Sequence, residues 1–406
     1  MGRGKILRSM IPLQDALDRL DKHARPAELE SVPLADALGR FLTTSIDTPI
    51  DIPPFSKSAM DGYAVRGADL ESDPARSLPV AGVIAAGGGA PPALEPGSAA
   101  QIMTGAPIPE GADRVIRVEY ATREGDTVAF GRLDGSSNII YRGENARKGE
   151  AILTPRRLGV HDIGVAASVG LDVLPVAKQP RLAVLSTGDE LVEPGASLET
   201  GRIYNSNAYQ LLAHARRAGF LPIYGGIAAD DESALYDRLS SVLESADVVV
   251  LSGGVSKGEF DYVPRVLASL DVREVFHRVA MKPGRPLYFG IRDTGAGGRQ
   301  YLFGLPGNPV SVFVTFELFA VRLLYRLAGL DPPGPTLALT LATTLQKGDP
   351  ERTEFVPVAV RNGLAEPVRY GGSSHLNALS RADALVELPI GTTEIKEGTV
   401  IHARPL

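Results

Sequence analysis

Four short loops combine glycine with polar side chains that could bind a phosphorylated ligand. They span residues 186–191, 252–261, 282–286 and 304–311. Glycine allows the backbone to approach a phosphate closely, and a helix N-terminus offers unpaired N–H donors. A single loop of this kind is more often a structural turn, but three of the four follow apolar runs typical of strands. Because ligands of open α/β sheets bind beyond the carboxyl ends of the strands, the three loops together predict a binding site.

Carboxylates and cations recur in and beside these loops, and their chemistry suits an anion held together with a metal ion. The carboxylates are Asp189, Glu190, Asp230, Asp231, Glu259 and Asp261. Mg²⁺ prefers one or two carboxylates together with phosphate oxygens. Lys282 and Arg285 would supply positive charge, and a guanidinium can bind an oxyanion through two N–H groups. For Asp189 and Asp231, a solvated position on the loop surface is the simpler interpretation.

Several familiar catalytic motifs are excluded. The pattern G-x-x-x-x-G-K-[ST] fails at Glu259, which stands where lysine is required, and no G-x-G-x-x-G opens a helix. The sequence has no cysteine, so it forms no disulfide, thiolate metal site or iron–sulfur cluster. Its six histidines lie far apart without H-E-x-x-H spacing, which argues against zinc chemistry. The chain is therefore neither a P-loop NTPase nor a Rossmann dehydrogenase.

Two further loops lie in a segment that is otherwise rich in short apolar runs. Residues 53–65 contain Asp61 before Gly62, and residues 103–113 contain Thr104 before Gly105. A β-turn accounts for the Asp-Gly pair by itself. The residues alone give no reason why this segment should carry two such loops.

The elements that must position these loops follow from the hydrophobic periodicity. Residues 178–330 alternate apolar runs with segments of helical period, which predicts a mostly parallel sheet covered by helices on both faces. Residues 50–147 show short alternating runs between glycines and prolines, which predicts a β-rich module. The leucines of residues 12–24 follow helical spacing, and residues 29–50 are typical of a strand, a helix and a strand.

The C-terminal part, residues 331–406, consists of short apolar runs and predicts a small β-barrel or sandwich. It begins with the sequence DPPGP, whose composition is that of a linker. We therefore expect few contacts across this point. A chain cut at Asp331 should then keep its other domains folded.

Length, charge and hydropathy narrow the class of protein. A chain of 406 residues with 44% hydrophobic and 22% charged residues is globular in composition and long enough for about two to four domains. The net charge of −6 and the lack of a dense basic block argue against nucleic acid as the main partner. No apolar stretch follows the basic first residues as in a signal peptide, and no apolar run reaches the ~20 residues of a membrane span. The sequence therefore predicts a soluble, cytoplasmic protein.

Six segments, in order along the chain, resemble those of the MoeA family, the molybdopterin molybdenumtransferases related to the E domain of gephyrin. They are PPFSKSAMDGYAV, IMTGAPIPEGAD, STGDEL with GRIYNSN, SGGVSKGEFD, KPGRPL and GLPGNPVS. The resemblance extends from the expected N-terminal helix to the last residues, IHARPL. Because it combines six ordered matches, it is far more specific than any single glycine-rich loop.

The resemblance implies a multidomain fold of α/β and β parts. These are a central three-layer αβα domain of MogA type at residues 179–330, a β-rich module at 48–146, a discontinuous linking domain at 1–47 and 147–178, and a C-terminal β-barrel at 331–406. The implied reaction converts the substrates adenylylated molybdopterin and molybdate into molybdenum cofactor and AMP, with Mg²⁺ or a similar divalent cation. The implied assembly is a homodimer whose active site joins the αβα domain of one subunit to the β-rich module of the other. The molybdopterin-adenylylating protein and molybdoenzymes would be transient partners.

The same resemblance implies roles for individual residues. The catalytic positions are Asp61, Thr104, Glu190, Asp230 and Asp261, and the last three are also the metal-binding positions. The residues implied to hold the pterin and its phosphate are Ser186, Thr187, Gly188, Ser206, Asn207, Gly253, Gly254, Ser256, Pro306, Gly307, Asn308 and Pro309. The residues implied to bind molybdate are Lys282, Arg285, Arg352 and Ser373.

Three positions depart from the family pattern. Asn145 replaces the acidic residue of a Gly-Glu-Asp motif, Arg285 replaces the usual lysine, and residues 372–376 read GSSHL where Ser-Gly usually follows the glycine. Asn145 keeps open an alternative in which the chain carries the pterin without inserting the metal. Tungstate insertion is a second alternative, because the two oxyanions are nearly equal in size and charge. Adenylylation of molybdopterin itself is disfavoured, because the related adenylylating domain normally stands without the module that carries Asp61.

Overall fold

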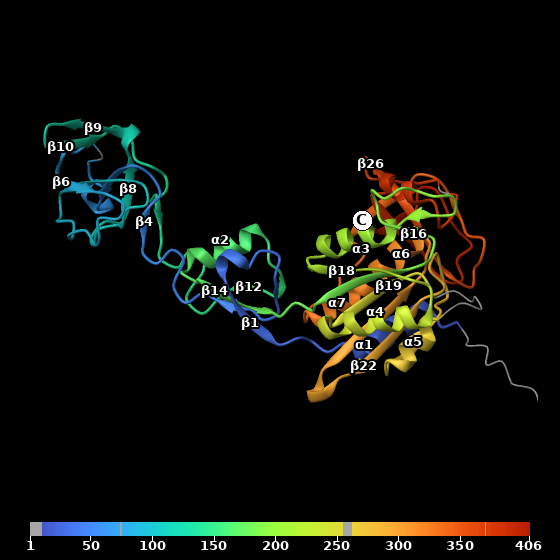
Figure 1. Ribbon diagram of the computed structural model, residues 1–406. Coiled ribbons are helices and arrows are strands. Elements are labelled where there is room, and N and C mark those ends of the chain that lie inside the picture. The colour runs from blue at the N-terminus through green and yellow to red at the C-terminus, as the bar shows by residue number, and fades with distance from the viewer. Residues whose placement is uncertain (1–9, 74, 255–261, 370) are drawn as a thin grey trace, which may run out of the picture. The chain divides into compact units, whose positions relative to one another are not determined.

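The computed structural model describes residues 10–73, 75–254, 262–369 and 371–406. Internal contacts divide the chain into two compact units (Figure 1). The larger unit comprises Met1–Val32, Gly39–Thr43 and Pro175–Leu406, and the smaller unit comprises Pro33–Leu38 and Thr44–Leu174. The four glycine-rich loops therefore belong to the larger unit, and the loops of Asp61 and Thr104 belong to the smaller one.

A six-stranded sheet lies at the centre of the larger unit. Its order is β18, β15, β19, β23, β22 and β20, and the first four strands are parallel to one another. β22 and β20 each pair with their neighbour in antiparallel fashion. The bounds are β15 Leu182–Thr187, β18 Pro222–Ala228, β19 Val248–Ser252, β20 Arg273–His277, β22 Tyr288–Asp293 and β23 Arg299–Leu305. The predicted mostly parallel sheet is thus confirmed, with antiparallel strands at one edge.

Alternate side chains of the parallel strands pack into two separate cores. Val184 and Val250 pack with α1, α3, α6 and α7 on one face, whereas Leu185 and Leu251 pack with α4 and α5 on the other. This division follows because successive side chains of a strand point to opposite faces. The helices are α1 Leu13–His23, α3 Ser206–Arg217, α4 Glu232–Ser245, α5 Val263–Ser269, α6 Pro309–Thr315 and α7 Val321–Leu327, with one π-helical turn at Phe316–Ala320. The result is the expected three-layer αβα arrangement.

The C-terminal part forms a small closed β-barrel. Its order is β26, β27, β24, β30 and β28, and β28 pairs again with β26 to close the circle. The bounds are β24 Leu337–Leu341, β26 Thr353–Arg361, β27 Leu364–Pro367, β28 Ala384–Leu388 and β30 Val400–Pro405. A core of its own fills the barrel, formed mainly by leucine, valine and alanine. Of the two alternatives that the sequence left open, the barrel is the one observed.

The expectation of few contacts across residues 331–335 is wrong. Phe355 and Leu385 of the barrel are buried in the same core as α6 and α7. The short strand β21 (Met281–Lys282) pairs with β26, and Arg404 contacts Glu317 at 3.4 Å between Nη1 and Oε1. Linker composition describes the local backbone, but it says nothing about the surface onto which the following strands fold.

The smaller unit contains a six-stranded sheet in the order β8, β5, β7, β6, β10 and β9. Its strands are β5 Gly62–Val65, β6 Leu78–Ile84, β7 Ala99–Ile102, β8 Arg114–Arg117, β9 Ala121–Glu124 and β10 Thr127–Phe130. Two-stranded sheets and α2 (Val160–Ser168) complete the unit. The region expected to be β-rich is therefore β-rich. In residues 29–50, a 3₁₀ turn at Leu34–Asp36 stands in place of the expected helix, between β1 (Leu29–Pro33) and β2 (Phe41–Leu42).

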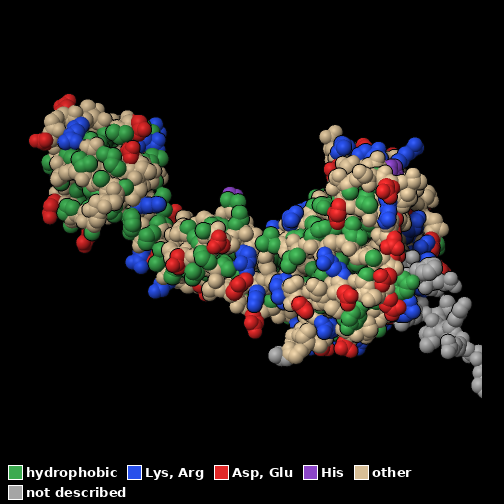
Figure 2. Space-filling model, viewed as in Figure 1, with side chains coloured by type: hydrophobic (Ala, Val, Ile, Leu, Met, Phe, Trp, Pro, Cys, Tyr) green, Lys and Arg blue, Asp and Glu red, His purple; other side chains and the backbone are tan. Residues whose placement is uncertain are grey.

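Acidic and basic side chains are interspersed over the face of the larger unit that Figure 2 shows. No broad surface of one sign is visible among the described residues on that face. No helix in the described ranges has the length and apolar character that a membrane crossing requires.

Candidate functional site

A cavity of about 710 Å³ opens at the carboxyl ends of three parallel strands of the larger unit. Thr187 ends β15, Gly253 and Gly254 follow β19, and Pro306 follows β23, and all four line the cavity. This is the place where the order of open α/β sheets predicts ligand binding. The described residues of the three strand-end loops singled out from the sequence therefore meet in one cavity.

One side of the cavity carries two carboxylates, Glu190 and Asp230. Thr187 Oγ1 donates a hydrogen bond to Asp230 Oδ1 at 3.2 Å, and the N–H of Asp230 donates to Asp189 Oδ1 at 3.0 Å. These bonds hold the Asp230 loop while the Glu190 side chain stays exposed. Asp231, expected to be a solvated loop residue, caps α4 by accepting hydrogen bonds from the N–H groups of its first turn.

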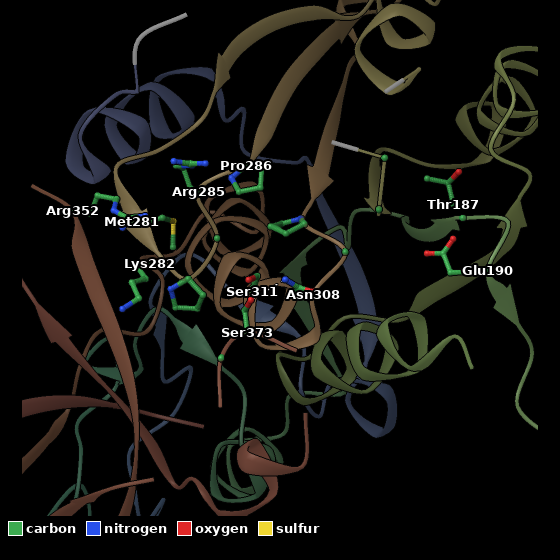
Figure 3. A pocket seen from close by; sticks show the side chains of 18 of the residues that line it. Thr187, Glu190, Met281, Lys282, Arg285, Pro286, Asn308, Ser311, Arg352 and Ser373 are labelled. Carbon is green, nitrogen blue, oxygen red and sulfur yellow. Dashed lines mark hydrogen bonds between the residues drawn. The ribbon is translucent and has the colours of Figure 1, made fainter. Parts of the chain in front are cut away.

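The opposite side carries three cations, Lys282, Arg285 and Arg352 (Figure 3). Lys282 Nζ lies 2.9 Å from Glu354 Oε1, and Arg352 Nε donates to Asp349 Oδ2 at 2.6 Å. Within the described part of the chain, the Arg285 side chain has no such carboxylate partner. An anion in the cavity would therefore face three positive groups, and in two of them a neighbouring carboxylate partly neutralises the charge.

Ser373 and Asn308 lie between the acidic and basic sides in Figure 3. Asn308 Nδ2 donates a hydrogen bond to Ser373 Oγ at 2.8 Å, and the N–H of Val310 donates to the Ser373 carbonyl at 3.0 Å. The C-terminal part thus contributes both Ser373 and Arg352 to the cavity wall. All four residues predicted to bind molybdate line this one cavity.

Close packing of the strand ends requires glycine at position 253. Gly253 has φ +100°, and a Cβ there would lie 2.5 Å from the carbonyl oxygen of Thr187. That distance is far below van der Waals contact, so any side chain would push the two loops apart. The backbone is consequently exposed at the cavity floor, where it can approach a ligand phosphate.

A second cavity of about 230 Å³ adjoins the first and shares Thr187, Glu190, Gly253, Gly307 and Asn308 with it. Its further lining residues include Ser206, Asn207 and Pro309, as predicted from their motifs. Asn207 Nδ2 donates hydrogen bonds to Ser252 Oγ at 3.0 Å and to the Gly307 carbonyl at 2.7 Å. Asn207 therefore ties the first turn of α3 to two of the strand-end loops.

Three predicted positions of the larger unit are not among the residues that line the two cavities. Ser186 is buried, donates a hydrogen bond from Oγ to Asn205 Oδ1 at 3.0 Å, and lines neither cavity. Ser256 and Asp261 lie outside the described residues. The remaining predicted positions of the larger unit, including Gly188, border one of the two cavities.

Asp61 and Thr104 contact each other in the smaller unit. Asp61 Oδ1 accepts hydrogen bonds of 2.7 Å from both the N–H and the hydroxyl of Thr104. These hydrogen bonds lower the pKa of Asp61 below its ordinary value. The bond from the Thr104 N–H has the larger effect, and the bond from the hydroxyl adds to it. The two loops meet because β5 and β7 pair, with Gly62 opposite Ile102. Asn145, exposed in another turn of the smaller unit, donates its N–H to the Ile52 carbonyl at 2.9 Å.

The carboxylates of the cavity suit a divalent cation that is shared with a ligand. Among the described residues, no three His, Asp or Glu side chains come close enough to hold a metal by themselves. Glu190 and Asp230 supply two carboxylates, which together with ligand phosphate oxygens are the donors that Mg²⁺ prefers. The residues present therefore fit such an ion.

One charged side chain beside the cavity has no counterpart among the residues expected from the sequence. Glu354 stands in a β-rich segment far along the chain, and the pairing of β21 with β26 brings it into contact with Lys282, a residue of the cavity wall. No local motif indicates that pairing.

Models of known protein families match nearly the whole chain in three parts. Residues 11–170 match the model of the MoeA N-terminal region (domain I and II), residues 183–326 match a probable molybdopterin binding domain, and residues 340–406 match the MoeA C-terminal region (domain IV). Molybdopterin molybdenumtransferase of Bacillus subtilis (strain 168) is 33% identical over 97% of this chain and 94% of that relative. Molybdopterin molybdenumtransferase 2 of Mycobacterium tuberculosis (strain ATCC 25618 / H37Rv) is 34% identical over 98% of this chain and 99% of that relative.

A solved structure agrees with this placement. The crystal structure of the molybdopterin biosynthesis moeA protein from Pyrococcus horikoshii OT3 superimposes with a TM-score of 0.81 at 30% identity, covering 97% of this chain and 99% of that one. Sequence and fold agree over nearly the full length of both chains. This chain is a member of the MoeA family of molybdopterin molybdenumtransferases.

Proposed function

We propose that this chain inserts molybdate into adenylylated molybdopterin and releases AMP. The observation that carries the proposal is the charge arrangement of the larger cavity. Two carboxylates, Glu190 and Asp230, face three cations across a floor of glycine-rich strand ends. A substrate with a pterin, a phosphoanhydride and a nearby oxyanion needs these three kinds of surface in one place.

Different residues of the cavity bind different parts of the substrates. Lys282, Arg285 and Arg352 attract the oxyanion and hold it beside the pterin, because cations near one another bind a dianion more strongly than any one of them. The backbone at Gly253 and Gly307 approaches the phosphate closely. Glu190 and Asp230 would hold the divalent cation, which would neutralise charge on the phosphate oxygens.

The proposal is tested by measuring AMP release from adenylylated molybdopterin with purified protein and Mg²⁺, with and without molybdate. Several turnovers that depend on molybdate are the expected result. Tight binding of the pterin without AMP release would instead identify a carrier, and Asn145→Asp would then be the next variant to assay. Repeating the assay with tungstate in place of molybdate shows which of the two oxyanions the protein inserts.

We further propose that the chain acts as a homodimer in which Asp61 and Thr104 of one subunit complete the cavity of the other. The resemblance to the family implies this arrangement. It is also supported by the exposed Asp61 carboxylate, which Thr104 holds in place on the smaller unit.

A complementation experiment tests the shared site. Asp61→Ala and Glu190→Ala should each slow AMP release at least about tenfold, because each removes a charged group from the site. When the two variants are unfolded, mixed in equal amounts and refolded, half of the dimers carry one intact site, so about a quarter of the wild-type rate should return. The matched control refolds each variant with itself. A mixture no faster than these controls would rule out a site shared between subunits.

A further inference from the structure

A buried carboxylate lies directly behind the basic side of the cavity. Glu354 is 8% exposed, and its Oε1 lies 2.9 Å from Lys282 Nζ. Its other oxygen, Oε2, is buried without a hydrogen-bond partner among the described residues. Burying a carboxylate oxygen without a partner costs free energy, so such a group calls for an explanation.

Strand pairing fixes where this carboxylate stands. β21 runs parallel to β26 with Lys282 opposite Glu354, and the N–H of Thr353 donates to the Ala280 carbonyl at 2.9 Å. Residues opposite each other in neighbouring strands point to the same face of the sheet. The Lys282 side chain is 47% exposed, so its ammonium group can contact both Glu354 and a ligand in the cavity.

A second lysine, Lys347 of the C-terminal part, interacts with the charge of Glu354. Lys347 is 7% exposed, and its Nζ donates to the Leu388 carbonyl at 3.2 Å. Burial lowers the pKa of Lys347, and the nearby charges of Glu354 and Asp349 act in the opposite direction. Glu354 therefore lies within the field of two lysines, one of which faces the cavity.

The carboxylates of the C-terminal part reduce the positive charge that an anion meets. Glu354 compensates Lys282 and Asp349 compensates Arg352, which leaves Arg285 without a carboxylate partner among the described residues. A negative charge beside a cation weakens the attraction of that cation for any anion. A pocket with three uncompensated cations would bind every small dianion tightly, including sulfate.

We propose that Glu354 is a positioning residue that sets the oxyanion specificity of the cavity by holding Lys282 and offsetting its charge. While Lys282 is paired with Glu354, its ammonium group is held on the Glu354 side and part of its charge is offset, which weakens its attraction for any dianion. If Lys282 were released, it would close on a smaller dianion such as sulfate. This inference rests on the proposed function, in which the cations of the cavity bind molybdate.

The test compares Glu354→Gln with wild type in the full-length protein. Sulfate and molybdate binding are measured by titration calorimetry, and AMP release is measured against molybdate concentration with and without sulfate. In Glu354→Gln the dissociation constant of sulfate should fall about tenfold, whereas the KM for molybdate should fall no more than about threefold. A defect in folding cannot produce such a gain in sulfate binding.

Two further variants complete the design. Glu366→Gln changes the same chemical group on the exposed side of β27 and should bind sulfate as wild type does. Glu354→Asp keeps the charge but withdraws it from Lys282, so its gain in sulfate affinity should lie between wild type and Glu354→Gln. Sulfate binding in Glu354→Gln that equals that of Glu366→Gln would overturn the inference.

The proposed function and this inference fail in different ways. If wild type releases no AMP with molybdate, the proposed function fails, and the sulfate titration still reports on Glu354. If wild type turns over normally and the ratio of sulfate to molybdate affinity is unchanged in Glu354→Gln, only the role of Glu354 fails.

Discussion

Replacing Glu190 by glutamine is expected to lower molybdate-dependent AMP release about a hundredfold, the usual cost of removing one preorganised charged group from an active site. Glu190 lines both cavities, on the side opposite Lys282 and Arg285. Glutamine has the same shape but no charge, so it can neither pair with a divalent cation nor balance the cations across the cavity. The rate is measured at saturating molybdate and Mg²⁺.

Glu190 is a cleaner test than Asp230. Asp230 accepts a hydrogen bond from Thr187, so Asp230→Asn would weaken a contact that holds the loop as well as remove the charge. The matched control is Glu199→Gln, an exposed carboxylate in the loop after β16 (Leu191–Val192), which should keep the wild-type rate. A Glu190→Gln protein as fast as this control would remove Glu190 from the mechanism.

The strands and their loops were predictable because both depend on local sequence. Short apolar runs such as RLAVL and DVVVL are typical of strands buried between two layers of helices, and the loops after parallel strands meet at one edge. Side-chain direction at the last residues of a strand was less certain. Thr187 borders the cavity, whereas the preceding Ser186 points into the interior and bonds to Asn205, because neighbouring residues of a strand face opposite sides.

Long-range pairing explains what the sequence could not reveal. Asp61 meets Thr104 through the pairing of β5 with β7, and Glu354 meets Lys282 through the pairing of β21 with β26. Neither register follows from periodicity, which identifies strands but not their partners. The family resemblance supplied Asp61 and Thr104 but gave no indication of Glu354. The boundaries of the linking domain at residues 47, 147 and 178 stay predictions.

Cutting the chain after Leu330 is expected to destabilise the αβα part strongly, contrary to what the composition of residues 331–335 suggests. The cut removes Phe355 and Leu385 from the core that they share with α6 and α7. Losing large buried side chains costs about 2–5 kcal/mol each in free energy of unfolding. The cut also removes Arg352 and Ser373 from the cavity wall. The shortened chain should therefore be poorly soluble or unfold well below the full-length protein, and it should not bind molybdate.

The cut also removes one partner of a buried carboxylate. Glu317 has a side chain only 6% exposed, and its oxygens contact His214, Arg217 and Arg404. Burial alone would raise the pKa of Glu317, but the bond from His214 and the charges of the two arginines lower it overall. The cut removes Arg404, which belongs to the last strand, and with it part of that compensation. Removing one partner of a buried ion pair costs about 3–5 kcal/mol.

Point variants of the full-length chain separate these contributions. Phe355→Ala should lower the free energy of unfolding by about 3–5 kcal/mol through loss of core packing. Arg404→Met should destabilise the protein through the uncompensated Glu317, and the loss should be smaller in Glu317→Gln/Arg404→Met because the buried charge is then gone. Val400→Ala, at a position 64% exposed on the same strand as Arg404, is the matched control and should unfold as wild type does. The opposite result would be a shortened chain that stays soluble and unfolds at the same temperature as the αβα part of the full-length protein. The αβα core would then have kept its stability without Phe355, Leu385 and Arg404, so these contacts would stabilise only the barrel.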